Sequence, residues 1–143
     1  MIKVETADQM LKATKENLPT DVAIFTAAVA DFKVKEKKET NVNWISLNSL
    51  EGNEINVQSI SSDDKIAVVS LWATWCVPCI KELDAISDVY EEWQEETGVE
   101  LIAVSVDDSR TVKRVKSLIN GKGWDYQILL DTNNDLKRAL GAS

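Results

Sequence analysis

Lys65-Ile-Ala-Val-Val-Ser-Leu-Trp72, followed by Ala73-Thr-Trp75 and then Cys76-Val-Pro-Cys79, is the stretch that decides the fold. The run up to Trp72 is almost continuously apolar, which is typical of a central strand covered on both faces of a sheet. Pro78 fits the first turn of a helix, where its missing N–H is not needed. The stretch therefore predicts a buried strand that leads through a short loop into a helix, with Cys76 at the junction.

The residues after Cys79 predict an amphipathic helix that ends near Gly98, because apolar residues recur there at helical spacing. These residues are Leu83, Ile86, Val89, Tyr90 and Trp93. Val99–Val106 is again almost continuously apolar and predicts a second buried strand.

Shorter elements are expected further along the chain. Asp108 or Ser109 can cap a helix that Asn120-Gly121 closes, Gln127–Leu130 is a candidate strand, and Leu136–Leu140 a last short helix. Strands and helices that alternate in this way predict an α/β sheet with crossover helices.

Upstream of the central strand the sequence is less regular. Trp44–Leu47 and Glu54–Val57 flank a glycine and predict a hairpin. A capping box opens a helix over about 6–17, and Val22–Ala30 predicts a buried strand, with a helix as the alternative for so short an alanine-rich stretch. The lysine-rich stretch 32–40 is expected to be a solvated linker. The expected division is therefore 1–41 and 42–143.

Composition limits the functions that the chain can have. Its 143 residues suffice for one compact domain, and Lys and Arg total 16 against 24 Asp and Glu, a net charge of −8. Nucleic acid and anionic membranes need a basic footprint, so neither is expected as the main partner. There is no apolar run long enough to span a bilayer and no signal-peptide pattern at the start, so we expect a cytoplasmic protein as the sequence is written.

Two cysteines and no histidine limit the chemistry further. Histidine-based acid–base catalysis is excluded. Two thiols are too few for a structural zinc site, so no metal and no cofactor are expected. At a helix N-terminus Cys76 would have a lowered pKa, and Cys79 is close enough to form a disulfide with it. These two features predict a redox pair, in which one thiol attacks a disulfide and the other resolves it. An inert pair and a metal half-site are the alternatives.

The motif Val69-Ser-Leu-Trp-Ala-Thr-Trp-Cys-Val-Pro-Cys-Ile-Lys-Glu-Leu83 resembles the active-site segment of the thioredoxin superfamily. It looks closest to the periplasmic or membrane-tethered branch of thiol–disulfide oxidoreductases. Ala103–Asp108 and Ile128–Asp131 match that branch too, so the resemblance covers about 42–141. It implies an incomplete thioredoxin-like sheet with flanking helices, and a protein dithiol or disulfide as substrate.

The resemblance also implies roles for individual residues. Cys76 would be the exposed nucleophile and Cys79 the buried resolving thiol. Trp75 and Pro78 would lie on the substrate side of the pair. Glu82, one helical turn past Cys79, would transfer a proton when Cys79 ionises, and a solvated helix carboxylate is the alternative reading of Glu82. Thioredoxins of the main branch carry a buried acid six residues before the first cysteine, a position that Ser70 occupies here.

The sequence departs from the family at both ends. It stops at Gly141-Ala-Ser143, before the family's cis-proline loop, hairpin and final helix. Substrate exchange would then be impaired, and strand 65–72 would become an exposed edge prone to dimerisation by strand exchange. At the other end, the segment of about 1–38 is similar, over Val4–Met10 and Leu18–Phe32, to a segment of phosphopantothenate–cysteine ligase, whose site would correspond to Ala27, Ala28 and Asp31.

Three hypotheses follow. The first is a thiol–disulfide oxidoreductase that acts through Cys76 and Cys79. The second is a catalytically idle chimera of thioredoxin-like and Rossmann-like fragments, in which Val22–Ala30 replaces the missing strand beside Ile66–Trp72. The third, a nucleotide-binding ligase fragment, lacks the ligase family's glycine-rich loop.

Overall fold

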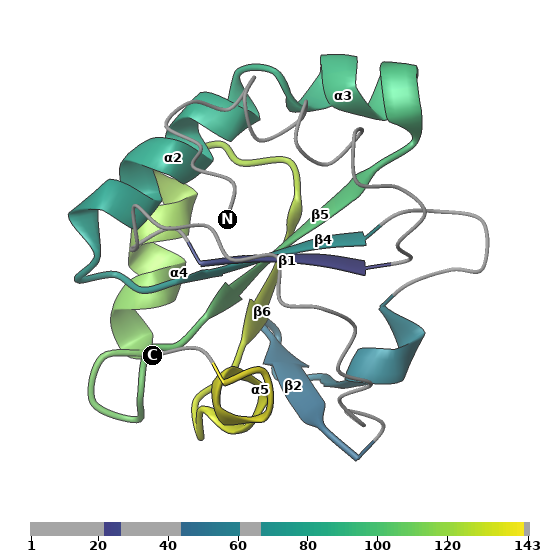
Figure 1. The fold of residues 1–143 in the computed structure, drawn as a ribbon. Coiled ribbons are helices and arrows are strands. Elements are labelled where there is room, and N and C mark those ends of the chain that lie inside the picture. Colours follow the sequence, from purple (N-terminus) through teal and green to yellow (C-terminus); the bar gives the residue numbers. More distant parts are fainter. Residues whose placement is uncertain (1–21, 27–43, 61–66, 142–143) are drawn as a thin grey trace.

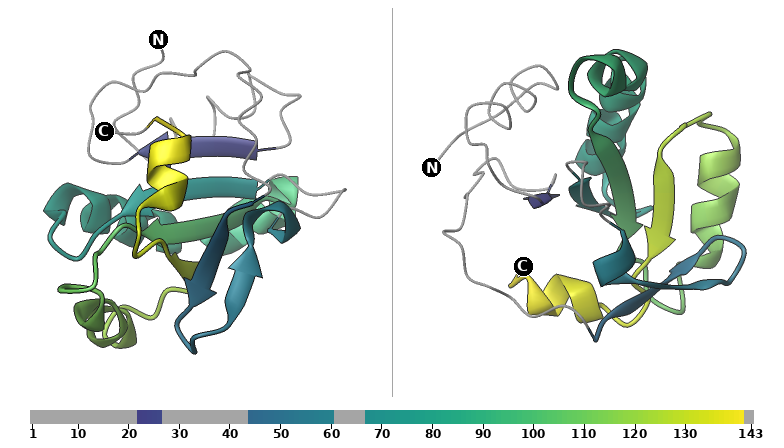
Figure 2. Two further views of the ribbon diagram at one scale, coloured as in Figure 1. Left: turned by 90° about the horizontal axis from the view of Figure 1, so that it is seen from below. Right: turned by 90° about the vertical axis from the view of Figure 1, so that its right-hand side faces the viewer.

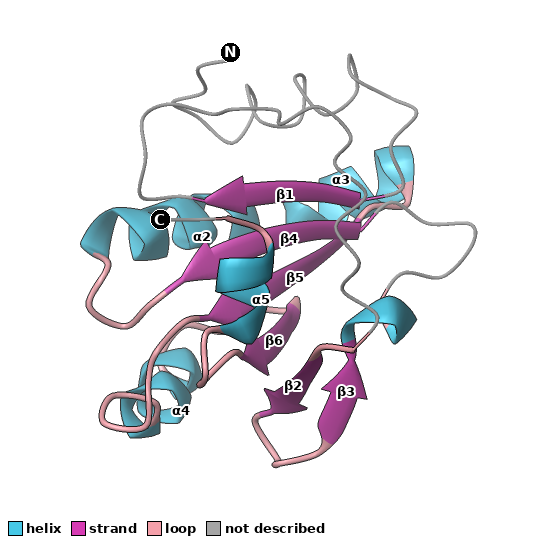
Figure 3. Cartoon of the chain, turned by 60° about the horizontal axis from the view of Figure 1, so that its bottom comes forward, coloured by secondary structure: helices cyan, strands magenta, loops and turns pink. Residues whose placement is uncertain are grey.

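Six strands form one mixed sheet in the computed structural model, which describes residues 22–26, 44–60 and 67–141. Their order is β1-β4-β5-β6-β2-β3 (Figure 3). The parallel strands are β1 (Val22–Thr26), β4 (Ala67–Trp72), β5 (Glu100–Ser105) and β6 (Gln127–Leu130). The antiparallel strands are β2 (Ser46–Ser49) and β3 (Glu54–Asn56). The α/β sheet predicted from the sequence is confirmed.

The strand β4 lies inside the sheet, and all six of its residues are buried. On one side it pairs with β5, and on the other it pairs in parallel with β1, where Val22 lies opposite Ala67 (Figure 1). The expectation that this strand would be an exposed edge is therefore wrong, because β1 occupies that side. The placement of an N-terminal strand beside β4 is confirmed for Val22–Thr26, whereas 27–30 and the predicted helix at 6–17 lie outside the described residues.

The helix expected to run on to Gly98 is divided in two. α2 spans Val77–Ser87 and α3 spans Tyr90–Thr97. The N–H of Val89 donates to the carbonyl of Ile86 at 3.0 Å, and Val89 has φ −121°, outside the helical range. Apolar spacing continues across this break, so the sequence pattern did not reveal it.

The later elements are close to their predicted positions. β6 has the predicted bounds, and α5 (Asp135–Ala139) begins one residue early. α4 (Lys113–Asn120) starts later than expected, because Asp108 accepts hydrogen bonds from the N–H groups of a preceding turn rather than capping the helix. In the described residues there is no helix long and apolar enough to cross a membrane.

The predicted hairpin is present. Leu47 of β2 lies opposite Ile55 of β3, and Gly52 in the turn has φ +89°, which favours glycine because it has no Cβ. The short helix η1 (Val57–Ser59) follows β3, and the Asn56 side chain caps its start. This hairpin extends the sheet beyond β6, at the far side from β1.

The two faces of the sheet carry separate cores. α2 and α3 lie on one side and α5 on the other (Figure 2). We call the first core the aromatic cluster: Val68, Trp72, Ala73, Cys76, Cys79, Leu83, Ile86, Tyr90, Trp93, Val99, Leu101, Ala103, Val115, Trp124, Tyr126 and Ile128. We call the second the aliphatic cluster: Ile45, Leu47, Ala67, Val69, Leu71, Ile102, Val104, Leu129 and Leu136.

Candidate functional site

The two cysteines lie where β4 gives way to α2. Cys76 is the N-cap of α2: its carbonyl accepts the N–H of Ile80 at 3.1 Å, and its own N–H donates to Ala73 at 3.0 Å. Pro78 lies in the first turn of the helix, as predicted. The unpaired N–H groups and positive dipole end of α2 therefore begin at Cys76, where they favour a thiolate over a thiol.

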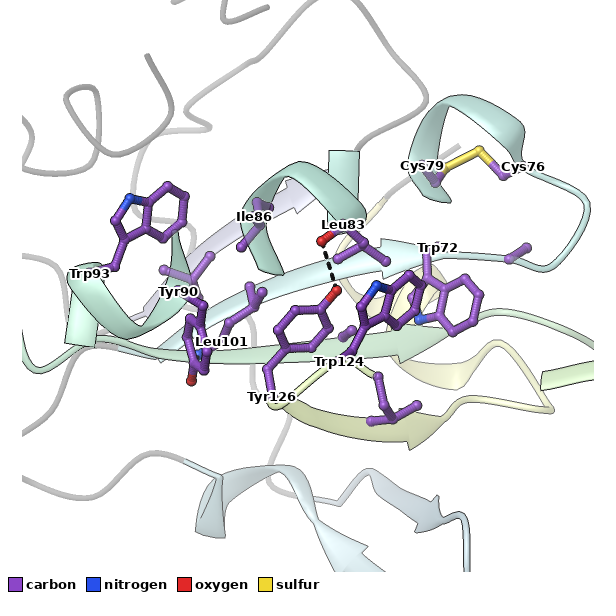
Figure 4. Close-up of a cluster of buried hydrophobic side chains, with 14 of the residues drawn as sticks. Trp72, Cys76, Cys79, Leu83, Ile86, Tyr90, Trp93, Leu101, Trp124 and Tyr126 are labelled. Carbon is purple, nitrogen blue, oxygen red and sulfur yellow. Dashed lines mark hydrogen bonds between the residues drawn. A yellow bond between two sulfur atoms is a disulfide. The ribbon is translucent and has the colours of Figure 1, made fainter. Parts of the chain in front are cut away.

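Cys76 and Cys79 form a disulfide, with their Cα atoms 5.3 Å apart. Cys79 is 2% exposed, in agreement with its expected burial, but Cys76 is only 7% exposed. The expectation of an exposed Cys76 is wrong for the oxidised pair: this residue is bonded to Cys79 of α2 (Figure 4) and packs as part of the aromatic cluster. Cys76 is still the more accessible of the two sulfur-bearing residues.

Apolar side chains surround the disulfide at the surface. Trp75 is 62% exposed and Val77 is 59% exposed, and Pro78 beside them is exposed as well. Three adjacent exposed apolar residues next to a reactive pair are unusual on a soluble surface and indicate a contact region. The resemblance places Trp75 and Pro78 on the substrate side, whereas no sequence pattern indicated a role for Val77.

Asp107, which the sequence analysis did not single out, holds the loop that precedes Cys76. Its carboxylate is 1% exposed and accepts the N–H of Thr74 at 2.8 Å and the Thr74 hydroxyl at 2.6 Å. The Ser105 hydroxyl also donates to it, at 2.7 Å. Charge-assisted hydrogen bonds are the strong ones, so this carboxylate fixes the end of β5 to the loop before Cys76.

Glu82 is half-buried on α2, three residues after Cys79, so the two side chains lie on the same side of the helix. Its Oε2 atom is buried and has no hydrogen-bond partner among the described residues. Burial raises the pKa of this carboxyl, because desolvation disfavours the charged form. The reading of Glu82 as a solvated carboxylate is therefore wrong. Ser70 is also buried, and no described residue bonds to its Oγ.

Polar groups behind the disulfide hold α2 in place. The Tyr126 hydroxyl donates to the carbonyl of Leu83 at 2.9 Å (Figure 4), and Trp124 Nε1 donates to Asp84 at 2.9 Å. The Lys122 ammonium pairs with the same Asp84 carboxylate at 2.6 Å. The rings of Trp72 and Trp124 meet edge to face, 5.3 Å apart. The helix that carries both cysteines is thus fixed to the segment between α4 and β6.

Two relatives of the chain are named as thiol-disulfide oxidoreductases. The chain is 30% identical over 128 residues to the thiol-disulfide oxidoreductase ResA of Oceanobacillus iheyensis, covering 87% of this chain and 59% of that protein. It is 30% identical over 120 residues to ResA of Bacillus thuringiensis, covering 82% and 66%. The chain therefore spans about three-fifths to two-thirds of the length of these relatives.

Solved structures agree on the fold. A thioredoxin-like protein of Porphyromonas gingivalis is 45% identical with a TM-score of 0.61, over 69% of this chain and 65% of that one. StoA of Bacillus subtilis is 22% identical with a TM-score of 0.54, over 68% and 70%, and shows likeness of fold alone.

The model of the AhpC/TSA family matches residues 26–143, a range that includes β4, the disulfide, α2 and Asp107. Since this match covers most of the chain, and its solved neighbours are thioredoxin-like, the chain belongs to the AhpC/TSA family and has a thioredoxin-like fold.

Proposed function

We propose that this chain is a thiol–disulfide oxidoreductase that exchanges disulfides with a protein substrate through Cys76 and Cys79. The observation that carries the proposal is the disulfide between them at the N-terminus of α2, where the helix stabilises a thiolate. The names of the ResA relatives support the same chemistry.

In the reducing direction the cycle begins with the dithiol. The Cys76 thiolate attacks one sulfur of a substrate disulfide, and the other substrate sulfur leaves as a thiolate. Cys79 then loses its proton and attacks Cys76 Sγ in the mixed disulfide. The Cys76–Cys79 bond forms again and the second substrate thiol is released. Two electrons pass from the chain to the substrate, and the reverse sequence oxidises a substrate dithiol.

Glu82 is our candidate acceptor for the Cys79 proton. A general base works best when its pKa approaches the working pH, and burial raises the pKa of Glu82 in that direction. Its unpartnered Oε2 has an acceptor position free among the described residues. Trp75 and Pro78 would contact the substrate beside the disulfide, since both are exposed there.

The idle chimera remains the alternative hypothesis. The pairing of β1 with β4 fits a replacement strand, and the ligase resemblance rests on sequence alone, with Ala27, Ala28 and Asp31 outside the described residues. Dimerisation by strand exchange and the cytoplasmic location also stay predictions. An idle scaffold predicts no activation of Cys76, and a ligase fragment predicts that nucleotide stabilises the fold.

The test is the pH dependence of iodoacetamide alkylation at Cys76 after phosphine reduction, read by mass spectrometry. We expect an apparent pKa well below about 8.5 in buffer and near about 8.5 in denaturant, because only the folded chain aligns α2 with the thiol. The Cys79→Ser variant should accumulate a mixed disulfide with a disulfide peptide, and Cys76→Ser should not. Equal pKa values in both conditions would favour the idle scaffold.

A further inference from the structure

A groove of about 700 Å³ has Trp75, the chain neighbour of Cys76, among the described residues that line it. Arg110 and Thr111, from the segment between β5 and α4, line it too. Lys137 and Arg138 of α5 line it as well. Its volume is within the range of ligand sites. Because Trp75 adjoins Cys76, residues that flank a substrate cysteine bonded to Cys76 would come near this groove.

The charge of the groove is opposite to that of the whole chain. The protein carries a net charge of −8, yet the described residues that line the groove include three cationic side chains, Arg110, Lys137 and Arg138, and one carboxylate, Asp108. A cleft in which one sign of charge predominates attracts ligands of the opposite sign. The excess of cations among the described lining residues therefore favours an acidic ligand.

The cations of the groove have hydrogen-bonding capacity left for a ligand. Arg110 is 85% exposed and uses Nε and Nη2 on Asp108, and none of the described residues uses the rest of its fork. Arg138 pairs with Asp135 through Nη2 at 2.7 Å. In the described part of the chain, no carboxylate lies within 4.0 Å of Lys137 Nζ. Lys137 is thus the cation whose charge is least compensated.

We propose that this groove selects substrate polypeptides with aspartate or glutamate close to the reacting cysteine. In an extended segment each residue advances about 3.3 Å, so carboxylates about two to four residues from that cysteine would lie along the groove. Trp75 would pack against the segment beside Cys76, and Lys137 and Arg110, which both line the groove, would bind its carboxylates. This inference rests on the proposed thiol–disulfide exchange.

Synthetic peptides with one cysteine, activated as a mixed disulfide with thionitrobenzoate, test the selection. When Cys76 attacks the peptide sulfur, coloured thionitrobenzoate leaves, and Cys79 then releases the peptide thiol. Three peptides differ only in flanking Glu, Gln or Lys residues. At low salt we expect the reduced chain to react about tenfold faster with the Glu peptide than with the Gln peptide. High salt should bring the ratio toward one, because it screens these charges.

Matched variants distinguish the effect of charges in the groove from the effect of the net charge of the protein. Lys137→Glu and Arg110→Glu should each remove the preference for the Glu peptide. Lys116→Glu, on the exposed side of α4 and outside the groove, makes the same charge change and should keep it. A Glu-to-Gln ratio near one in the unaltered chain, or an equal loss in Lys116→Glu, would overturn the inference. Release no faster than with Cys76→Ser/Cys79→Ser would instead refute the proposed function itself.

Discussion

The two faces of the sheet bury different kinds of side chain. Among the described residues, the aromatic cluster contains all the buried tryptophans and tyrosines and both cysteines, whereas the aliphatic cluster has only Ala, Val, Leu and Ile. Among the described residues, Trp72 of the aromatic cluster and Glu82 of α2 also have buried polar atoms without a hydrogen-bond partner. The face that holds the disulfide therefore buries polar atoms that are not satisfied, whereas the aliphatic cluster itself consists of apolar side chains alone.

A matched pair of substitutions tests this comparison most strongly. Leu83 of the aromatic cluster and Leu129 of the aliphatic cluster are both 0% exposed. Replacing either by alanine leaves a cavity and should cost about 2–5 kcal/mol of unfolding free energy, measured by denaturant titration. Only Leu83→Ala should also raise the alkylation pKa of Cys76 toward about 8.5, because Leu83 holds α2 against the sheet. A similar pKa change in Leu129→Ala would show that the faces are not independent.

Two buried aspartates extend the comparison to the carboxyl ends of the strands. Asp107 follows β5 and binds the active-site loop, while Asp131 follows β6 and accepts the N–H groups of Leu136 and Lys137 in α5. Asp107→Ala leaves three donors without an acceptor and should cost about 3 kcal/mol. Asp131→Ala removes a helix cap and should cost about 1 kcal/mol.

Thiol reactivity shows whether Asp107 positions the loop or only stabilises the fold. Asp107→Ala should raise the alkylation pKa of Cys76, and Asp107→Asn should partly restore it, because the amide oxygen still accepts the Thr74 N–H. Asp131→Ala serves as the control, since its hydrogen bonds lie at α5. If Asp107→Ala loses stability but keeps the Cys76 pKa of the unaltered chain, then Asp107 has no positioning role.

The sequence predicted the strand, loop and helix around Cys76 because local signals determine them: a long apolar run and a proline in the first turn. It did not reveal Asp107, since an aspartate after a strand also suits a turn or a cap, and its partner Thr74 lies 33 positions away. The low exposure of Cys76 is likewise a tertiary effect, which depends on the disulfide and on the packing of α2.

The burial of Glu82 has a smaller effect on the stability of the fold, and this effect depends on pH. Its pKa is raised in the folded state, so the folded chain binds this proton more tightly than the unfolded chain does. The protonated Glu82 therefore contributes stability that is fully present at pH values below its unfolded-state pKa. That contribution is lost as the pH rises through its folded-state pKa. Glu82→Gln removes the charge, and it should raise the melting temperature at neutral pH but not at pH values below the unfolded pKa.

The same variant separates a proton-transfer role from simple burial. If Glu82 accepts the Cys79 proton, Glu82→Gln should slow resolution of the mixed disulfide while leaving the first attack by Cys76 unchanged. Glu92→Gln, an exposed glutamate of α3, is the control for the loss of one charge. A gain in stability without slower resolution would mean that Glu82 is a buried carboxylate with no part in the exchange. If Glu82→Gln both raises the melting temperature and slows resolution of the mixed disulfide, then Glu82 lowers the stability of the aromatic face while it serves the exchange reaction.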